Sequence, residues 1–504
     1  MWQIDKDEPL LISDLWASLF LEEAKRLGVK TLCMGAGFRA FPLIKAAENS
    51  DLDIVIHYDE RSIGFHAMGI AKAKRNPVIV MTTSGTAAAN LLPAIVEAHY
   101  QHIPLIALTS DCPPEMQDCA ASQSIRQADL YQGFTRYRRE VPTPSLDLSA
   151  EYLLTIMNEA VNYSSGQPVA GPVHLNMAFR EPFFPTENPS VPSAKALSDT
   201  QLNAYTKGID AWMRSDQAWK TVNTTTEVLA LPDSLESILR DSKSKKGLVC
   251  LAAVDQVNDP RLWNFIQALG WPVLVDPQSA YAAVDAVPIL PSVDRYLAQI
   301  QSEDIPELAI VIGTRFVSKY MNPFLSKIPA VYQLSTQRAF LDPSFASRHH
   351  LFGGLPSFLD AALPLVSTSL TENSWAKDCY QRWALDAEEW RAQVRDDDNA
   401  LELQCYEALS GLDSVDTHIV VANSLSVRLL SAIFSRNVDV SSAESVEATR
   451  TQVWTQRGTN GIDGVMSAAF GVARAVDAAL TLIIGDMSLA FDNNALSFLS
   501  TIEK

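Results

Sequence analysis

The sequence predicts an α/β protein built from three doubly wound domains with parallel sheets, the first and third sharing one fold. Two observations lead to this prediction. Short apolar runs rich in β-branched residues alternate with Ala-rich segments of helical spacing, and a seven-residue motif from the first part of the chain recurs near its end. Parallel strands are buried on both faces, so they read as continuous apolar runs of this kind.

Composition sets the class of protein. A chain of 504 residues, 47% of them hydrophobic, is long enough for about three globular domains. The charged first residues do not predict a signal peptide, and no apolar run approaches the roughly 20 residues that a membrane span needs. The net charge of −19 argues against a general nucleic-acid-binding protein, because phosphate binding needs a basic face. Six scattered cysteines predict buried thiols in the reducing cytoplasm.

The first domain is expected to span residues 1–187 and to contain a parallel sheet. Its strands are predicted at 52–58, 77–83 and 103–109, and its helices at 62–74 and 86–100. Strands that alternate with helices in this way form βαβ units. A proline-rich stretch at 181–193 then predicts a linker.

Two further α/β regions follow, expected at 188–370 and 371–504. The strands of the second region are predicted at 247–255, 272–277, 308–313 and 330–335. The polar stretch 367–374 marks the boundary between the two regions.

One internal repeat links the first and third domains. The segment "AMGIAKA" at 67–73 recurs as "AFGVARA" at 469–475, and each copy leads into an apolar strand. Small residues on one face of a helix let a neighbouring helix or sheet approach closely. The repeat predicts a duplicated domain, in which Glu60 of the first copy corresponds to Ile462 of the second.

Glu60 is the first candidate for chemistry. It lies where a predicted strand ends and a helix begins, and ligands of open α/β sheets bind at the carboxyl ends of strands. The alternative is a helix-start carboxylate that the helix dipole stabilises. Ser84, Gly85 and Thr86 open the next helix, which suits either a bound anion or an ordinary N-cap. The pattern GxGxxG does not occur there, so a dinucleotide site has weak support.

Seven short motifs occur in order along the chain: "DERSIGFHAMGIAKA", "TTSGTAAANLLPAIVEA", "SDCPPEMQDCAASQSI", "GPVHLNMAFREP", "SLSVR", "RGTNGIDG" and "IIGDMS". Together they resemble the thiamine-diphosphate-dependent 2-succinyl-5-enolpyruvyl-6-hydroxy-3-cyclohexene-1-carboxylate synthase family of menaquinone synthesis. The resemblance covers most of the chain and is strongest in the first and third domains. It implies a pyrimidine-binding domain at 1–187, a central domain at 188–370 and a diphosphate-binding domain at 371–504.

The resemblance also implies a cofactor site. Thiamine diphosphate would lie between the pyrimidine domain of one subunit and the diphosphate domain of another, in a homodimer or homotetramer with shared active sites. Glu60 would be the catalytic residue, which hydrogen-bonds the aminopyrimidine ring, and Ile462 would support the bent cofactor. Gly485 and Asp486 would hold the diphosphate side, with Asp486 as a ligand of Mg²⁺ or Mn²⁺.

The substrates that the resemblance implies are 2-oxoglutarate and isochorismate, which carry several carboxylates between them. Fixed guanidinium groups bind carboxylates bidentately. The residues that match substrate-binding positions of the family are Arg39, Gln123, Ser424, Arg428 and Arg457. For each arginine alone, the alternative is a surface ion pair.

The resemblance therefore predicts a transferase. It would decarboxylate 2-oxoglutarate with thiamine diphosphate and add the resulting succinyl carbanion equivalent 1,4 to isochorismate. Two alternatives stay open: another thiamine-diphosphate carboligase of the acetolactate-synthase kind, and a non-catalytic paralogue that acts only as an assembly partner. The matched arginines distinguish the first alternative, because an enzyme that uses only pyruvate needs fewer cationic anchors.

Several positions depart from the family pattern. Phe38 replaces a small polar residue beside the first substrate arginine. Ser122 stands where the family has asparagine, Cys112 where it commonly has arginine, and Gln456 for another asparagine. These changes leave open whether isochorismate is still the acceptor.

The end of the sequence departs most. In the family, an asparagine side chain and a backbone carbonyl further along the chain complete the metal site of Asp486, and that stretch is absent. The segment after Asp486 is predicted as a helix that Asp492 could cap, with Leu496, Leu499 and Ile502 on one face. The resemblance implies a C-terminally incomplete chain, for which we expect weak cofactor binding, an exposed apolar face and little turnover.

Overall fold

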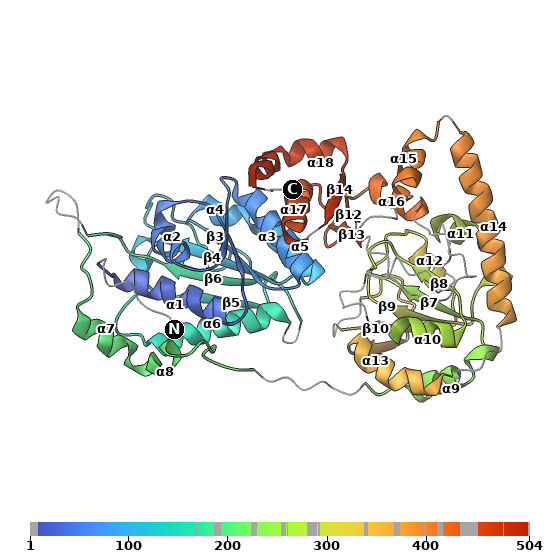
Figure 1. The fold of residues 1–504 in the computed structure, drawn as a ribbon, viewed down its shortest axis with the longest axis horizontal. Coiled ribbons are helices and arrows are strands. Elements are labelled where there is room, and N and C mark those ends of the chain that lie inside the picture. Colours follow the sequence, from blue (N-terminus) through green and yellow to red (C-terminus); the bar gives the residue numbers. More distant parts are fainter. Residues whose placement is uncertain are drawn as a thin grey trace. The chain divides into compact units, whose positions relative to one another are not determined.

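The structure is a computed structural model. It describes residues 9–501 except for 167–168, 186–192, 223–228, 254–258, 260, 280–289, 291–292, 337–340, 367–372, 398, 411–416, 434–451 and 477. The described residues divide into two compact units, one within 1–223, 456–477 and 484–504 and the other within 224–455 and 478–483 (Figure 1). Each unit is described by itself. Most of the stretch predicted as a linker at 181–193 lies outside the described residues.

The first sheet has six parallel strands in the order β2-β1-β3-β4-β6-β5. Its strands are β1 (Thr31–Met34), β2 (Asp53–Ile56), β3 (Val78–Thr82), β4 (Leu105–Asp111), β5 (Tyr137–Val141) and β6 (Val173–Ala178). The three strands predicted for this region are confirmed as β2, β3 and β4. Because β1 pairs with both β2 and β3, the carboxyl ends of these three strands meet at one edge of the sheet.

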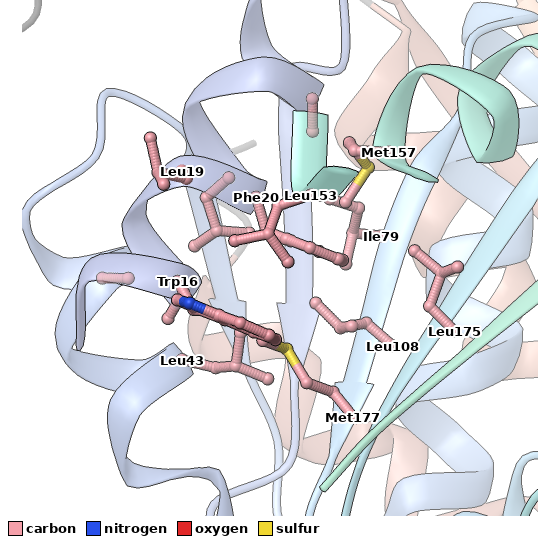
Figure 2. Packing of buried hydrophobic residues seen from close by; sticks show 14 of the residues in the cluster. Trp16, Leu19, Phe20, Leu43, Ile79, Leu108, Leu153, Met157, Leu175 and Met177 are labelled. Carbon is pink, nitrogen blue, oxygen red and sulfur yellow. The ribbon is translucent and has the colours of Figure 1, made fainter. Parts of the chain in front are cut away.

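Helices cover both faces of this sheet, as a doubly wound fold requires. One face carries α1 (Ile12–Arg26), α2 (Phe41–Glu48) and α6 (Ala150–Ser165). Figure 2 shows Phe20 of α1 beside Leu153 of α6, and Trp16 of α1 beside Leu43 of α2 and Met177 of β6. Ile79 of β3 and Leu108 of β4 belong to the same core. The other face carries α3 (Glu60–Lys74) and α5 (Leu92–Gln101) (Figure 1).

The single helix predicted at 86–100 is wrong in one respect. The structure divides it into α4 (Thr86–Asn90) and α5 (Leu92–Gln101). Pro93 occupies the first turn of α5. Proline has no N–H and its ring clashes with the preceding turn, so it is tolerated at a helix start and not inside a continuous helix.

The second sheet has five parallel strands in the order β11-β10-β9-β7-β8. Its strands are β7 (Gly247–Leu251), β8 (Val273–Val275), β9 (Leu308–Ile312), β10 (Ala330–Ser335) and β11 (His349–Phe352). The four predicted strands are confirmed, and β11 is an addition. The helices of this part are α9 (Asp233–Arg240), α10 (Arg261–Leu269), α11 (Val293–Gln299), α12 (Met321–Leu325), α13 (Leu355–Ala362), α14 (Ser374–Asp396) and α15 (Leu401–Ser410). Two short helices, α7 (Asp199–Thr206) and α8 (Asp210–Met213), belong to the first unit.

The third sheet repeats part of the first. Its described strands are β12 (Thr417–Val421), β13 (Gln452–Thr455) and β14 (Ala479–Ile483), all parallel, in the order β13-β12-β14. The first sheet has the same local order, β2-β1-β3, and in each case a small-residue helix links the two outer strands along the chain. These helices are α3 and α17 (Val465–Ala475). The shared order supports the predicted duplication, while the exact domain boundaries stay predictions.

The two repeated helices, α3 and α17, pack directly against each other within the first unit. A Cβ atom on Gly69 would lie 2.2 Å from the carbonyl oxygen of Ala468, and one on Gly471 would lie 2.1 Å from the carbonyl oxygen of His66. Gly69 and Gly471 occupy the same place in the two repeat motifs, and so do the residues that they touch. The packing is therefore a pseudo-two-fold contact, in which each glycine makes room for the backbone of the other helix.

The last described segment also packs on these helices. It consists of α18 (Asp486–Phe491) and the 3-10 helix η7 (Asn493–Thr501), in which Phe498 is buried and stacks on His66. The expectation that Asp492 caps its own helix is wrong. Its carboxylate accepts hydrogen bonds from Ser467 N (2.7 Å) and Ser467 Oγ (2.9 Å), so it holds the first turn of α17.

The apolar residues expected on one face of this last helix divide between described and undescribed positions. Leu496 and Leu499 lie one 3-10 turn apart, and both are exposed. Ile502 lies outside the described residues. None of the helices in the described part of the chain is both long enough and apolar enough to cross a membrane.

The interface of α3 and α17 makes stability sensitive to acid. Burial lowers the pKa of His66 to about 3, and the charges of Arg474 and His57 act in the same direction. Above pH 6.5 this histidine is neutral in the folded and unfolded states, so it contributes nothing. As the pH falls below 6.5, the unfolded chain binds a proton that the folded chain does not, and stability is lost down to the folded pKa.

We expect His66→Phe to reduce this acid sensitivity. Phenylalanine keeps the ring that stacks on Phe498 but cannot bind a proton. Between pH 7 and pH 4.5 the variant should lose about 2 kcal/mol less unfolding free energy than the parent chain. Urea unfolding at the two pH values measures the difference. An equal loss in both proteins would show that His66 is protonated in the folded chain.

Candidate active site

Glu60 lies at the carboxyl edge of the first sheet. It follows β2 and opens α3, whose N-cap is Asp59, a side chain that accepts from Arg61 N (2.9 Å) and Ser62 N (3.2 Å). A Cβ atom on Gly35, the residue after β1, would lie 3.2 Å from Glu60 Cγ. The Glu60 side chain therefore lies over the end of the neighbouring strand. Among the described residues no hydrogen bond or ion pair occupies its half-buried carboxylate.

Unpartnered hydroxyl groups lie at the end of β3, on the same edge. The side-chain oxygens of Thr82, Thr83 and Ser84 are buried and make no hydrogen bond within the described part of the chain. Gly37 lies against this segment, because a Cβ atom there would be 2.3 Å from Thr83 Cβ. Buried hydroxyls normally have a partner, so this group fits a polar ligand at the edge of the sheet.

Gly85 continues this edge in a conformation that favours glycine, with φ +85°. Its N–H donates to Gln127 Oε1 (2.6 Å), and the buried Gln127 amide in turn donates to Ser110 O and Asn176 Oδ1. Gln123, predicted to bind substrate, is exposed beside Gly85. The sequence reasoning did not single out Gln127, although it follows the "AASQSI" motif by a few residues.

The loop between β13 and α17 carries two more predicted site residues, Arg457 and Ile462. Arg457 is half-buried and Ile462 is exposed. Gln456 Nε2 donates to Gly464 O (2.9 Å) and so closes the base of the loop. Gly464 has φ +66°, and a Cβ atom there would lie 1.9 Å from the ring of Phe65 in α3. The end of the loop is therefore fixed against the helix that begins with Glu60.

Arg39, the first predicted substrate arginine, is paired with a protein carboxylate. It lies in the 3-10 helix η1 (Phe38–Ala40), donates to Phe179 O (3.2 Å) and forms an ion pair with Glu181 Oε1 (2.7 Å). Its side chain is mostly buried, while that of Glu181 is half exposed. The guanidinium is thus held in place by a carboxylate at the surface, which a substrate carboxylate would have to displace or share.

Phe38, one of the departures from the family pattern, is exposed and belongs to an aromatic cluster with Phe41, Phe183 and Phe184. This cluster lies beside Arg39, whose guanidinium is 5.6 Å from the ring centre of Phe183. Two other departures differ in environment, because Cys112 is buried and Ser122 is exposed.

Ser424 and Arg428 belong to the second compact unit. Ser424 is exposed, has φ +69° and precedes α16 (Leu425–Ile433), in which Arg428 is half-buried. Burial raises the pKa of Asp294, and the charge of Arg428 acts in the opposite direction. Arg428 therefore lies close enough to a half-buried carboxylate of its own unit to stabilise its charged form.

Gly485 and Asp486 follow β14 at the start of α18. Both are exposed, and among the described residues the Asp486 side chain accepts a hydrogen bond from its neighbour Met487 N (2.9 Å). In the part of the chain that the structure describes, no group of three or more His, Cys, Asp or Glu side chains could hold a metal ion. Asp486 would supply one of the six oxygens that Mg²⁺ prefers, so the described residues give no complete metal site.

Two family profiles match this chain. "Thiamine pyrophosphate enzyme, N-terminal TPP binding domain" matches residues 16–131, and "Middle domain of thiamine pyrophosphate" matches residues 203–419. The first match contains Glu60, the hydroxyls at the end of β3 and Gln127.

Similar curated proteins carry one name. The 2-succinyl-5-enolpyruvyl-6-hydroxy-3-cyclohexene-1-carboxylate synthase of Shewanella sediminis is 34% identical, over 99% of this chain and 83% of the relative. The synthase of Shewanella halifaxensis is 33% identical over 97% and 81%, and that of Shewanella frigidimarina is 33% identical over 96% and 80%.

Proposed function

Since the chain belongs to the thiamine-diphosphate-dependent family of 2-succinyl-5-enolpyruvyl-6-hydroxy-3-cyclohexene-1-carboxylate synthases, we propose that it releases CO₂ from 2-oxoglutarate and adds the remaining four-carbon unit to isochorismate in menaquinone biosynthesis. The chain is a transferase of the thiamine-diphosphate class. The observation that best supports a working site is the Glu60 carboxylate, which shares a sheet edge with the hydroxyls at the end of β3. None of these groups has a partner among the described residues, and sheets of this kind bind ligands at this edge.

Glu60 is assigned the proton transfer. A carboxyl group in a half-buried position can share a proton with a ring nitrogen, which is general acid–base chemistry. When bound, thiamine diphosphate supplies the acidic carbon and the electron sink that decarboxylation of an α-keto acid needs. Thr82, Thr83 and Ser84 would hold polar atoms of the cofactor, and Ile462 would present an apolar contact from the loop before α17.

Arginines are assigned the substrate carboxylates, because a guanidinium binds a carboxylate through two parallel hydrogen bonds. Arg457 belongs to a loop that lies against α3, and Arg39 is held near the same sheet edge. Gln123, Ser424 and Arg428 are also assigned to substrate binding, from their match to the family positions.

Three further assignments stay proposals. Asp486 would be a protein ligand of Mg²⁺ or Mn²⁺, and Gly485 would approach the diphosphate. A homodimer or homotetramer would share its sites between chains. A cytoplasmic location rests on the scattered cysteines alone.

Product formation tests the proposed reaction. The purified chain is incubated with thiamine diphosphate, Mg²⁺, 2-oxoglutarate and isochorismate, and CO₂ release and the adduct mass are followed. We expect one CO₂ for each adduct formed. Adduct formation from pyruvate, with none from 2-oxoglutarate, would instead support a carboligase of the acetolactate-synthase kind.

We expect Arg457→Ala or Arg428→Ala to weaken substrate use by about 2 kcal/mol, the lower end of the range for breaking a buried charge pair, because both arginines are half-buried. Cofactor affinity should change far less. The matched control is Arg474→Ala: this arginine of α17 already pairs with Asp53 (2.6 Å). Steady-state kinetics and titration with thiamine diphosphate measure both effects. An equal fall in cofactor affinity would place these arginines in the diphosphate site or in folding.

A further inference from the structure

Glu97 is a buried carboxylate inside a helix. It lies in α5, with 2% of its surface exposed. Its Oε1 accepts from Gly458 N (2.7 Å), and its Oε2 accepts from Thr459 N (2.6 Å) and Thr459 Oγ1 (2.6 Å). Gln101, one helical turn further along α5, donates to Oε1 as well. One side chain thus takes three hydrogen bonds from the first residues of the loop 457–464.

These bonds are of the strong kind. An ionised carboxylate that accepts backbone N–H groups forms charge-assisted hydrogen bonds, roughly twice as strong as neutral ones. Burial excludes water that would compete for the same donors. Lys72 Nζ donates to Gln101 Oε1 (2.6 Å), so the hydrogen-bonded network of Glu97 extends through Gln101 to a lysine of α3.

The loop lies directly against α5 at this point. A Cβ atom on Gly458 would lie 2.7 Å from the carbonyl oxygen of Glu97 and 3.0 Å from its carboxylate. At the other end, Gly464 lies against the ring of Phe65. The loop is therefore fixed at both ends, and Ile462 between them is exposed.

We propose that Glu97 is a positioning residue, which fixes the loop 457–464 so that Arg457 and Ile462 face substrate and cofactor. The roles of these two residues rest on the proposed function. The position of the loop does not, because it follows from the hydrogen bonds of Glu97 to Gly458 and Thr459 and from the close approach of Gly458. Glu97 acts through the loop and needs no contact with substrate or cofactor. In the sequence Glu97 stands near the end of the motif "TTSGTAAANLLPAIVEA", where nothing distinguishes it from any other polar residue of a helix.

The chain offers a matched control in Glu23. This carboxylate of α1 is also fully buried, and it accepts from Trp219 N (2.8 Å), Trp212 Nε1 (2.8 Å) and Asn158 Nδ2 (3.2 Å). Its partners belong to the helical layer and the segment after it, on the opposite side of the sheet from α3 and α5. Glu23→Gln removes a buried charge of the same kind without touching the loop.

Amide hydrogen exchange tests the position of the loop without any substrate. Glu97→Gln keeps the shape of the side chain but replaces one acceptor oxygen with an NH₂ donor. At least one N–H of the loop then points at a donor and loses its hydrogen bond. We expect exchange in a peptide that covers 457–464 to speed up at least tenfold in Glu97→Gln and to be unchanged in Glu23→Gln. Equal protection in both variants and the parent would overturn the proposal.

Kinetics then test the consequence. In Glu97→Gln the KM for the substrate that Arg457 binds should rise about tenfold, whereas Glu23→Gln should keep the parent KM, even if its melting temperature falls. A parent KM in Glu97→Gln, together with faster exchange, would overturn the positioning role. If the parent chain has no synthase activity, the proposed function fails and the exchange result still decides whether Glu97 holds the loop.

Thr459→Val provides a second variant in case Glu97→Gln does not fold. It removes the hydroxyl donor to Oε2 and keeps the backbone donors, so we expect a smaller increase in exchange, about twofold to fivefold. In the double variant with Glu97→Gln the two effects should not add, because both act on one carboxylate. Full additivity would show that Thr459 and Glu97 act independently.

Discussion

Glu60→Gln should slow exchange of the C2 proton of bound thiamine diphosphate by about 100-fold or more, the usual contribution of a positioned acid–base group. Glutamine keeps the size of the side chain and its hydrogen bonding, but it cannot give or take a proton at pH 7. Because the Glu60 carboxylate makes no bond to the described protein, folding should be unchanged. Quenched-flow exchange in D₂O, followed by NMR of the released cofactor, measures the rate.

The neighbouring carboxylate gives the control. Asp59 caps α3 through Arg61 N and Ser62 N, so Asp59→Ala should cost about 1 kcal/mol of stability. It should leave the exchange rate per bound cofactor close to that of the parent. Parent-like exchange in Glu60→Gln would remove the proton transfer from this residue and return it to the role of a helix-start carboxylate.

Gly471→Val should destabilise the first unit by about 4 kcal/mol or more, above the usual 1–3 kcal/mol for overpacking. The atom in the way is the carbonyl oxygen of His66, which lies 2.1 Å from the position of the new Cβ and belongs to helix backbone. A side chain could rotate away, whereas α3 and α17 must separate. Gly69→Val should behave alike, because the contact is pseudo-symmetric. Urea unfolding followed by circular dichroism measures the loss.

Gly485→Ala is the matched control for stability. A Cβ atom at this position has nothing within 4 Å, and its φ of −73° is ordinary for alanine. The substitution should change the unfolding free energy by less than about 1 kcal/mol. If Gly471→Val is as mild as this control, α3 and α17 are not packed through their repeat motifs.

Local pattern identified many strands of the first two sheets but missed β1, β5, β6 and β11. Each predicted strand of the first two domains is present, because buried parallel strands need apolar residues on both faces and so leave a continuous signal. The recurrence of "AMGIAKA" as "AFGVARA" indicated a duplication, and the strand orders β2-β1-β3 and β13-β12-β14 agree with it. The helix predicted at 86–100 is divided at Leu91, two residues before Pro93, a proline signal that is visible in the sequence.

The resemblance named the candidate site residues but not their partners. Arg39 matched a family position, but its ion pair with Glu181 was not predicted. The pair forms only because the fold brings η1 close to the segment that follows β6. Asp492 was read as a local cap, because Asp before a helical run usually is one. In the structure its carboxylate holds α17 instead, since a buried carboxylate binds the donors that the fold brings to it.

The sequence by itself determined the fold class, the duplication, the family and the type of cofactor, because periodicity, repeats and motifs are local properties of the chain. Only the tertiary structure decided that Glu97 holds Gly458 and Thr459, which are more than 350 residues further along. The reason is physical: which groups satisfy a buried charge depends on which segments the packing of α3, α5 and α17 brings together, and no local pattern records that distance.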